Sequence, residues 1–235
     1  MAASALPPSA RLDTCMCPRL YLFPYHDDIG KPSAIEVNLC QRAPNSNLKK
    51  PIVWVLGGPG SGKGVQCEKI IDKYSFSHLS TGRLLRAEME GKTARAPFIT
   101  AIMEQGDMVS NEVCLELLKE AIHKPTDTKG FLVDGYPREK AQAVAFEKVV
   151  ASPSAILFFE ASDETLTQRL LRRGATSGRP DDNEVAIKQR LKHYHETRQA
   201  LLDQYPCKVA RISAEYGVDD IFAEVEKVLD PIVHA

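Results

Sequence analysis

The sequence predicts an α/β fold built on a parallel β-sheet, and two observations carry this prediction. From residue 51 onward, short apolar runs alternate with segments of helical periodicity, which is typical of stacked βαβ units. The first run, 51–56, leads directly into the glycine-rich stretch GGPGSGKG, and an amphipathic helix follows that stretch. A chain of 235 residues is long enough to form one such domain with a sizeable core.

Five compact apolar runs are the candidate strands of this sheet, at 51–56, 76–80, 130–134, 154–160 and 207–213. A helix is expected from near Gly62, because Cys67, Ile70, Ile71 and Tyr74 recur at helical spacing. Further helices are expected after a cap at Ser110 or Asn111, from near Asp182 to about 205, and over 218–229.

Residues 1–50 differ from the rest of the chain. They are rich in Pro, Ser and Asn and show no sustained apolar period, so we expect a largely disordered extension before a domain at 51–235. We expect a cytoplasmic protein, and mitochondrial import through this extension is an open alternative.

Composition excludes several classes of partner. The 30 basic and 31 acidic residues nearly cancel, so there is no strong electrostatic case for nucleic-acid binding. No apolar run approaches the roughly 20 residues that span a bilayer. The six cysteines show no C-x-x-C spacing, so neither a zinc site nor a disulfide framework is indicated. We expect a monomer without nucleic-acid or membrane partners.

The pattern Gly57-x-x-x-x-Gly62-Lys63 lies between a predicted strand and a predicted helix, which is the context of a phosphate-binding loop. Glycines let successive backbone N–H groups point at an anion, and the positive end of the following helix adds to the attraction. Lys63 is placed to reach the β- and γ-phosphates. The sequence therefore predicts a nucleotide phosphate site here.

A second candidate group follows the strand at 130–134. Asp134 ends this strand, at the edge of the sheet where α/β proteins bind ligands, and it suits water-mediated magnesium binding. Arg138 follows four residues later, near the same crevice.

Arginines flank the stretch GATSGRPDDN, namely Arg173, Arg179 and Arg190. Guanidinium groups bind phosphate oxygens in pairs, so we interpret this short Gly/Ser/Pro loop as a mobile lid that excludes water. We interpret Arg172 as a solvated surface residue. Asp181 and Asp182 either pair with these arginines or cap the next helix, and the cap is at least as good an interpretation for Asp182.

These residues resemble the nucleoside monophosphate kinases, and among them the short adenylate kinases. The motifs that carry the resemblance, between about 51 and 229, are GGPGSGKG, HLSTGRLLRAE, GFLVDGYPRE, RRGATSGRPDDNE and SAEYGVDDIF. The resemblance implies the phosphate-loop kinase fold, with a five-stranded parallel sheet flanked by helices. It also implies an insert over the nucleoside monophosphate at about 80–109 and a short lid at about 172–182.

The resemblance further implies Mg²⁺-dependent transfer of the ATP γ-phosphoryl group to AMP, giving two ADP, with Asp134 holding Mg²⁺ through water. The implied catalytic residues are Lys63, Arg138, Arg173, Arg179 and Arg190. The implied ATP-binding residues are Gly60, Ser61, Gly62, Lys63, Gly64, Val65, Arg173 and Tyr216. The implied AMP-binding residues are Thr81, Arg86, Asp107, Met108, Val109, Gly135, Arg138, Gln142, Arg179 and Arg190. The lid lacks the cysteines with which longer adenylate kinases hold zinc, so no zinc is implied.

Three residues depart from the family pattern. Val65 replaces a threonine, Arg83 replaces an acid, and Tyr216 replaces a glycine. They motivate a second hypothesis, a nucleotide-binding protein with weakened catalysis. A third hypothesis is a UMP/CMP kinase, but Thr81 favours the adenylate enzymes because the pyrimidine kinases usually carry alanine there.

Overall fold

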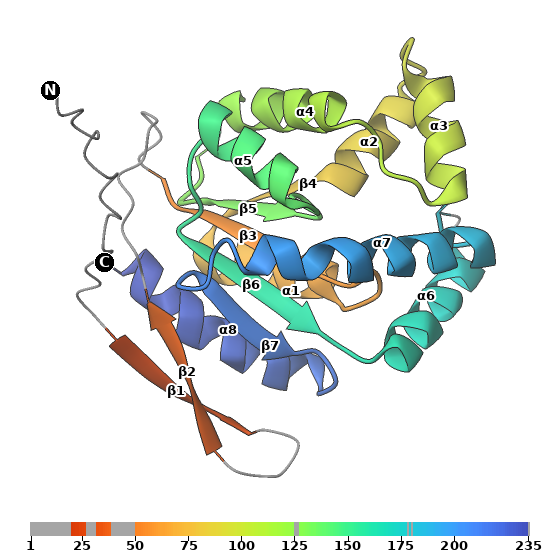
Figure 1. The fold of residues 1–235 in the computed structure, drawn as a ribbon. Helices are drawn as coiled ribbons and strands as arrows, with labels where there is room; N and C mark the ends of the chain where they lie inside the picture. The colour runs from red at the N-terminus through yellow and green to blue at the C-terminus, as the bar shows by residue number, and fades with distance from the viewer. Residues whose placement is uncertain are drawn as a thin grey trace, which may run out of the picture.

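The computed structural model describes residues 20–26, 32–38, 50–124, 127–177, 179 and 181–234. Its centre is a parallel five-stranded sheet in the order β4-β5-β3-β6-β7 (Figure 1). The predicted fold class is therefore confirmed. The strands are β3 (Ile52–Gly57), β4 (Ser77–Ser80), β5 (Phe131–Asp134), β6 (Ala155–Glu160) and β7 (Val209–Ser213).

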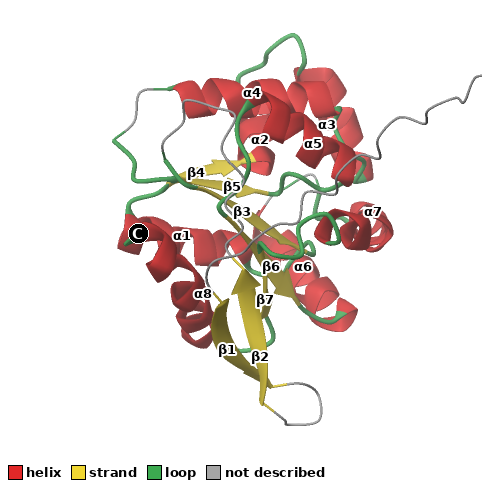
Figure 2. Cartoon of the chain, turned by 60° about the vertical axis from the view of Figure 1, so that its left-hand side comes forward, coloured by secondary structure: helices red, strands yellow, loops and turns green. Residues whose placement is uncertain are grey.

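Helices cover both faces of this sheet. They are α1 (Lys63–Tyr74), α2 (Thr81–Glu90), α3 (Ala96–Gln105), α4 (Asn111–His123), α5 (Lys140–Val149), α6 (Asp163–Ser177), α7 (Glu184–Leu202) and α8 (Val218–Val233). Figures 1 and 2 show α1 and α8 together on one side, and α4, α5 and α7 on the other. Helices α2 and α3 occupy the segment expected for the insert.

The central strand β3 divides the core between the two faces. Trp54 and Leu56 pack with α4, α5 and α7, whereas Val53 and Val55 pack with α1 and α8. The Trp54 ring is fully buried and meets Phe146 and Tyr205 edge-on, with ring centroids 5.7 and 5.2 Å away. Because strands of a parallel sheet are covered on both faces, they appear in the sequence as continuous apolar runs.

A separate hairpin lies within the segment expected to be an extension without regular structure. Strands β1 (Leu20–His26) and β2 (Pro32–Asn38) pair antiparallel. In both views β2 passes beside β7, the outer strand of the five-stranded sheet (Figures 1 and 2). The other residues before Lys50 lie outside the described ones, so the division into extension and domain stays a prediction.

The cap of α7 differs from our expectation. Asn183 occupies the cap position, and its side-chain oxygen accepts a hydrogen bond of 2.9 Å from the Ala186 amide. Asp182 instead pairs with Arg173. All three residues of the Asp-Asp-Asn run are suitable cap residues. Because Asp182 is paired with Arg173, the cap position is occupied by Asn183.

None of the helices among the described residues is both long enough and apolar enough to cross a bilayer.

Candidate active site

The candidate site lies where the chain leaves the carboxyl ends of β3 and β5. These strands are neighbours, with Val55 opposite Asp134, and the chain continues on both sides of them. In α/β sheets this is the place where a crevice forms. A cavity of about 530 Å³ opens here, between the phosphate loop, the insert and the start of α7.

The phosphate loop takes a shape that requires glycine at several of its positions. Gly57 and Gly60 have φ angles of 141° and 86°, in the region that other residues rarely adopt. A Cβ at Gly57 would also lie 2.4 Å from the Phe159 carbonyl oxygen. Helix α1 follows with Gly62 at its cap and no side-chain hydrogen bond there, so its first N–H groups remain available for an anion.

Lys63 extends from the first turn of α1 back over this loop. Its Nζ donates to the carbonyl oxygens of Gly57 and Gly58 at 2.9 and 2.8 Å, and to Ser61 Oγ at 3.3 Å. Burial lowers the pKa of Lys63 to about 8, although the negative charge of Asp134 opposes that shift. The lysine is therefore held in place by the loop and is mostly charged at neutral pH.

Asp134 stands at the end of β5 with its side chain 13% exposed. Burial alone would raise its pKa, but the His78 hydrogen bond and the charge of Lys63 outweigh burial and hold the pKa below its usual value. The bond joins His78 Nε2 and Asp134 Oδ2 at 3.2 Å. The site therefore contains an ionised carboxylate fixed by a histidine from β4.

Two buried polar side chains line the side of the cavity nearest α2 and α5. Thr81 Oγ1 donates to the Gly135 carbonyl oxygen at 3.2 Å. Gln142 Oε1 accepts from the Arg138 amide at 2.8 Å, which fixes the orientation of the carboxamide. The Arg138 guanidinium donates to the Gly135 oxygen at 3.0 Å. These contacts position groups that suit a purine edge and a phosphate.

Two arginines are held by consecutive acids at the start of α7. The Asp182 carboxylate accepts two hydrogen bonds from the Arg173 guanidinium, at 2.7 Å from Nε and 2.6 Å from the second nitrogen. Asp181 Oδ2 lies 2.7 Å from Arg190, whose pKa burial lowers to about 10. Arg190 thus stays charged at neutral pH. The acids aim both guanidinium groups and tie the end of α6 to α7.

The cavity concentrates positive charge. Among the described residues, eight Lys and Arg side chains line it against four Asp and Glu, an excess of +4 in a chain whose net charge is −1. Burial lowers the pKa of Arg86, and the nearby charge of Arg179 lowers it further, which shows that these cations are crowded together. Such crowding costs free energy unless anions occupy the site.

Comparison with known proteins identifies the family. Residues 55–210, about two thirds of the chain, match the family model described as adenylate kinase. The chain belongs to the adenylate kinase family. It is 48% identical to adenylate kinase isoenzyme 1 of Sus scrofa over 187 residues, covering 78% of this chain and 96% of that protein. Isoenzyme 1 of Homo sapiens is 46% identical over the same shares, and that of Caenorhabditis elegans is 48% identical over 80% and 91%.

Almost all residues that the adenylate kinase resemblance implied are brought together around the cavity. Two do not line it. Ser61 is 1% exposed and its hydroxyl accepts from Lys63, and Tyr216 is 64% exposed outside the cavity. The lining residues are Gly60, Gly62, Lys63, Gly64, Val65, Thr81, Arg86, Asp107, Met108, Val109, Asp134, Gly135, Arg138, Gln142, Arg173, Arg179 and Arg190.

Arg169 and His78 are among the lining residues of this adenylate kinase cavity that the sequence motifs did not single out. Arg169 lines it and donates to the Ala214 carbonyl oxygen at 2.9 Å. It precedes Arg173 by four residues, so helical spacing could have placed both on one face of α6. His78 carried a weaker signal, because its contact with Asp134 depends on the register between β4 and β5.

The departures Val65 and Arg83 lie at the rim of the same cavity. Val65 is 47% exposed, so its side chain presents methyl groups and no hydroxyl at this rim. Arg83 forms an exposed ion pair with Glu68 at 3.2 Å, between α2 and α1. Glu68, on α1, is an oppositely charged partner for Arg83, and an acid at position 83 would not have this favourable contact.

Proposed function

We propose that this protein catalyses the reversible transfer of the γ-phosphoryl group of ATP to AMP, giving two ADP. The observation that carries the proposal is the excess of four positive charges in the cavity between the phosphate loop and the insert. MgATP and AMP together bring about four negative charges at neutral pH, since a terminal phosphate carries close to −2. One site can thus hold both nucleotides with their charge neutralised.

Phosphoryl transfer depends on positioning and on charge neutralisation, and it needs no covalent nucleophile from the protein. In our proposal Lys63, Arg173 and the amides of the phosphate loop bind the ATP phosphates. Arg86 and Arg138 bind the AMP phosphate, so that one of its oxygens faces the γ-phosphorus.

Arg179 and Arg190 neutralise the charge that develops between the two nucleotides. Closing the lid over them excludes water, which would otherwise accept the phosphoryl group.

The adenine edge of AMP is proposed to bind Gln142. Its oxygen is held by the Arg138 amide, which directs its NH₂ group toward a ligand acceptor. Thr81 is 3% exposed and is held by Gly135, so it shapes this side of the cavity.

Adenylate kinases use magnesium nucleotides, and the residues here fit that cation. Mg²⁺ takes one or two carboxylates, substrate phosphates and several waters. Asp134 is an ionised carboxylate on the cavity wall, and no hydroxyl at positions 64 and 65 adds to it. In our proposal Asp134 holds Mg²⁺ through water, and the bound cation would neutralise β- and γ-phosphate oxygens. A cytoplasmic location and a monomeric state stay predictions.

The test is a coupled assay of nucleoside diphosphate formation with ATP and either AMP, CMP or UMP, with and without Mg²⁺. We expect turnover with AMP and Mg²⁺ and much lower turnover with the pyrimidine acceptors. Turnover at background with every acceptor would contradict the proposal, and a preference for CMP or UMP would redirect it to the pyrimidine kinases.

Two arginine variants test the roles within the site. Arg138→Ala and Arg179→Ala are each expected to lower kcat/KM by about 10³ or more, because each removes a phosphate clamp. Arg172→Ala is the matched control, since Arg172 is exposed on α6 beside Arg173 and does not line the cavity. Equal effects of Arg138→Ala and Arg172→Ala would contradict the assignment.

A further inference from the structure

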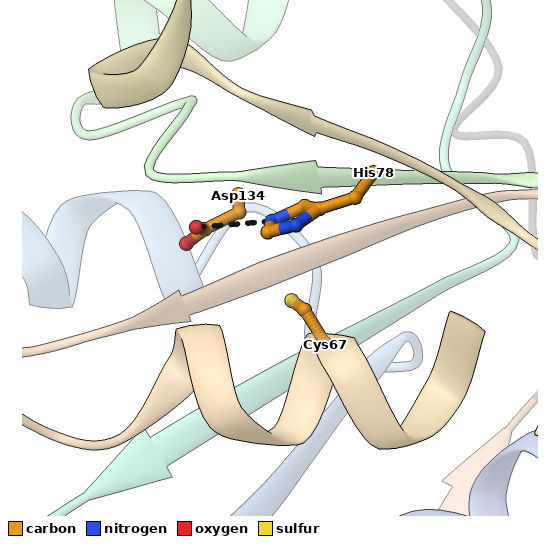
Figure 3. Close-up of side chains that lie close together, drawn as sticks. All are labelled: Cys67, His78 and Asp134. Atoms are coloured by element: carbon orange, nitrogen blue, oxygen red, sulfur yellow. Dashed lines mark hydrogen bonds and ion pairs between the residues drawn. The ribbon is translucent and has the colours of Figure 1, made fainter. Parts of the chain in front are cut away.

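Three potential metal ligands from three elements meet beneath the nucleotide cavity. Cys67 comes from α1, His78 from β4 and Asp134 from the end of β5 (Figure 3). One ligand atom from each lies within 4.8 Å of the other two. Within the described ranges of the chain, this is the one group of three such side chains. Sequence spacing could not reveal it, because the three residues are far apart in the chain.

The three side chains are enclosed. Cys67 is fully buried, and the side chains of His78 and Asp134 are 4% and 13% exposed. Figure 3 shows the Cys67 sulfur directed from α1 toward the imidazole. His78 Nδ1 is buried and has no hydrogen-bond partner among the described residues. A buried, unpartnered ring nitrogen next to a sulfur and a carboxylate is an observation that points to a ligand.

The donor set selects a particular class of cation. Mg²⁺ and Ca²⁺ bind oxygen, whereas a sulfur, an imidazole nitrogen and a carboxylate oxygen together suit Zn²⁺ and similar divalent transition metals. Tetrahedral zinc with Zn–S near 2.3 Å and Zn–N near 2.0 Å places its ligand atoms about 3.3 to 3.6 Å apart. The three ligand atoms already lie within 4.8 Å of one another, so no pair has to approach by more than about 1.5 Å to reach this geometry.

We propose that Cys67, His78 and Asp134 form a binding site for Zn²⁺ or a similar divalent transition metal ion. As the metal–sulfur bond forms, the Cys67 thiol gives its proton to solvent. Solvent supplies the fourth ligand, since three protein ligands leave one tetrahedral position open. His78 and Asp134 line the nucleotide cavity, which provides the entry path.

Occupancy of this site would interfere with catalysis, an inference that rests on the proposed function. The bound cation takes an oxygen of Asp134, the residue proposed to hold Mg²⁺ through water. It also adds positive charge near Lys63, with which Asp134 interacts. We therefore infer that zinc inhibits phosphoryl transfer by a route that removing zinc with a chelator reverses.

The binding test uses Co²⁺ as a spectroscopic substitute for Zn²⁺ in the full-length chain. Cys15, Cys17 and Cys40 are changed to Ser in all variants, so that thiols before Lys50 do not contribute. We expect a thiolate-to-cobalt charge-transfer band that saturates at one Co²⁺ per chain, disappears on adding Zn²⁺ and survives excess Mg²⁺. Cys67→Ala is expected to abolish the band and to weaken Zn²⁺ binding by about 100-fold or more.

Cys207→Ala is the matched control, because Cys207 lies outside the cavity, and it should keep the band unchanged. Cys67→Ser provides a second variant if the alanine variant does not fold. Absence of the band in the parent protein, or its persistence in a folded Cys67 variant, would overturn the site. This absorbance readout is independent of catalysis, so it separates failure of the metal site from failure of the proposed activity.

Discussion

Val65 is the position at which the effect of the missing hydroxyl on magnesium-nucleotide binding can be tested most directly. Its side chain is 47% exposed at the cavity rim, and neither position 64 nor position 65 carries a hydroxyl. One hydrogen bond to a charged group contributes about 1.5 to 3 kcal/mol, whereas the phosphate clamps each contribute more. We therefore expect an active enzyme whose kcat/KM is lower than it would be with a hydroxyl at position 65.

Val65→Thr is expected to raise kcat/KM about tenfold, because the new hydroxyl can bind the hydrated magnesium nucleotide. The coupled assay at saturating Mg²⁺ measures the change. Val65→Ala removes methyl groups without adding a hydroxyl and should stay within about twofold of the parent. Equal gains in the threonine and alanine variants would show that the valine acts through its size alone.

The pKa of Lys63 predicts how nucleotide binding depends on pH. Burial lowers this pKa to about 8, and only the charged amine attracts phosphate. ATP affinity should therefore be roughly constant between about pH 7 and 8 and fall by up to tenfold per pH unit above pH 8, as calorimetric titration would measure. A flat profile for the parent protein up to about pH 9 would contradict this assignment.

Two variants check the cause of that fall. Lys63→Arg should give a flat profile, because arginine keeps its charge over this range. Asp134→Asn should move the fall to lower pH, since the charge of Asp134 raises the pKa of Lys63.

Individual site residues were predictable where their chemistry is local in the sequence. The glycine spacing before Lys63 and the strand-ending Asp134 follow from short motifs, and both line the cavity. His78 was missed because its role depends on strand register. Helical spacing could have placed Arg169 on the same face of α6 as Arg173, but its contact with Ala214, 45 residues away, is not a local signal. Tyr216 was placed by motif alignment alone, and the turn before α8 directs it to solvent.

At the scale of elements, strands were predicted to within two residues because each is a buried apolar run between turn residues. The start of α7 was harder. Asp181, Asp182 and Asn183 all favour a cap, and only the tertiary contact with Arg173 assigns Asp182 to an ion pair. This contact also joins the lid to the core at the start of α7.

Breaking that junction has a testable effect on stability. Asp182 is 1% exposed and binds Arg173 through both oxygens. Asp182→Asn keeps the shape but removes the charge, and it should lower the free energy of unfolding at neutral pH by about 1 to 3 kcal/mol. Glu184→Gln, an exposed acid in the first turn of α7, is the control and should change it by less than about 0.5 kcal/mol.

The pH dependence of the difference in unfolding free energy between the parent protein and Asp182→Asn identifies the cause of that difference. Burial would raise the pKa of Asp182, but Arg173 outweighs burial and holds the pKa below its usual value. The stabilisation is therefore present above the unfolded-state pKa of about 3.9 and is lost as pH falls through the lower folded-state pKa. Parent and Asp182→Asn should converge in urea unfolding at acid pH. A difference that is constant with pH would indicate a packing defect instead.

At the scale of the whole molecule, catalytic geometry depends on the sheet order rather than on the chain before β3. Among the described residues, every one that lines the cavity lies at position 56 or later, and the family match begins at residue 55. The β1–β2 hairpin lies beside β7 (Figure 2). The hairpin, which is the described part of the extension, is therefore in contact with β7, and none of its residues is among those that line the cavity.

Deleting residues 1–49 should leave kcat/KM within about twofold of the full chain, because none of the described cavity-lining residues is removed. The deletion uncovers one side of β7, the outer strand of the sheet, and unpaired strand edges favour association. We expect a Tm lower by no more than about 4 °C, equivalent to roughly 1 kcal/mol in a domain of this size, together with a greater tendency to aggregate on heating. Activity assays, calorimetry and light scattering on both proteins measure these three effects. A loss of kcat/KM beyond tenfold in a folded deletion variant would mean that the extension contributes to the site.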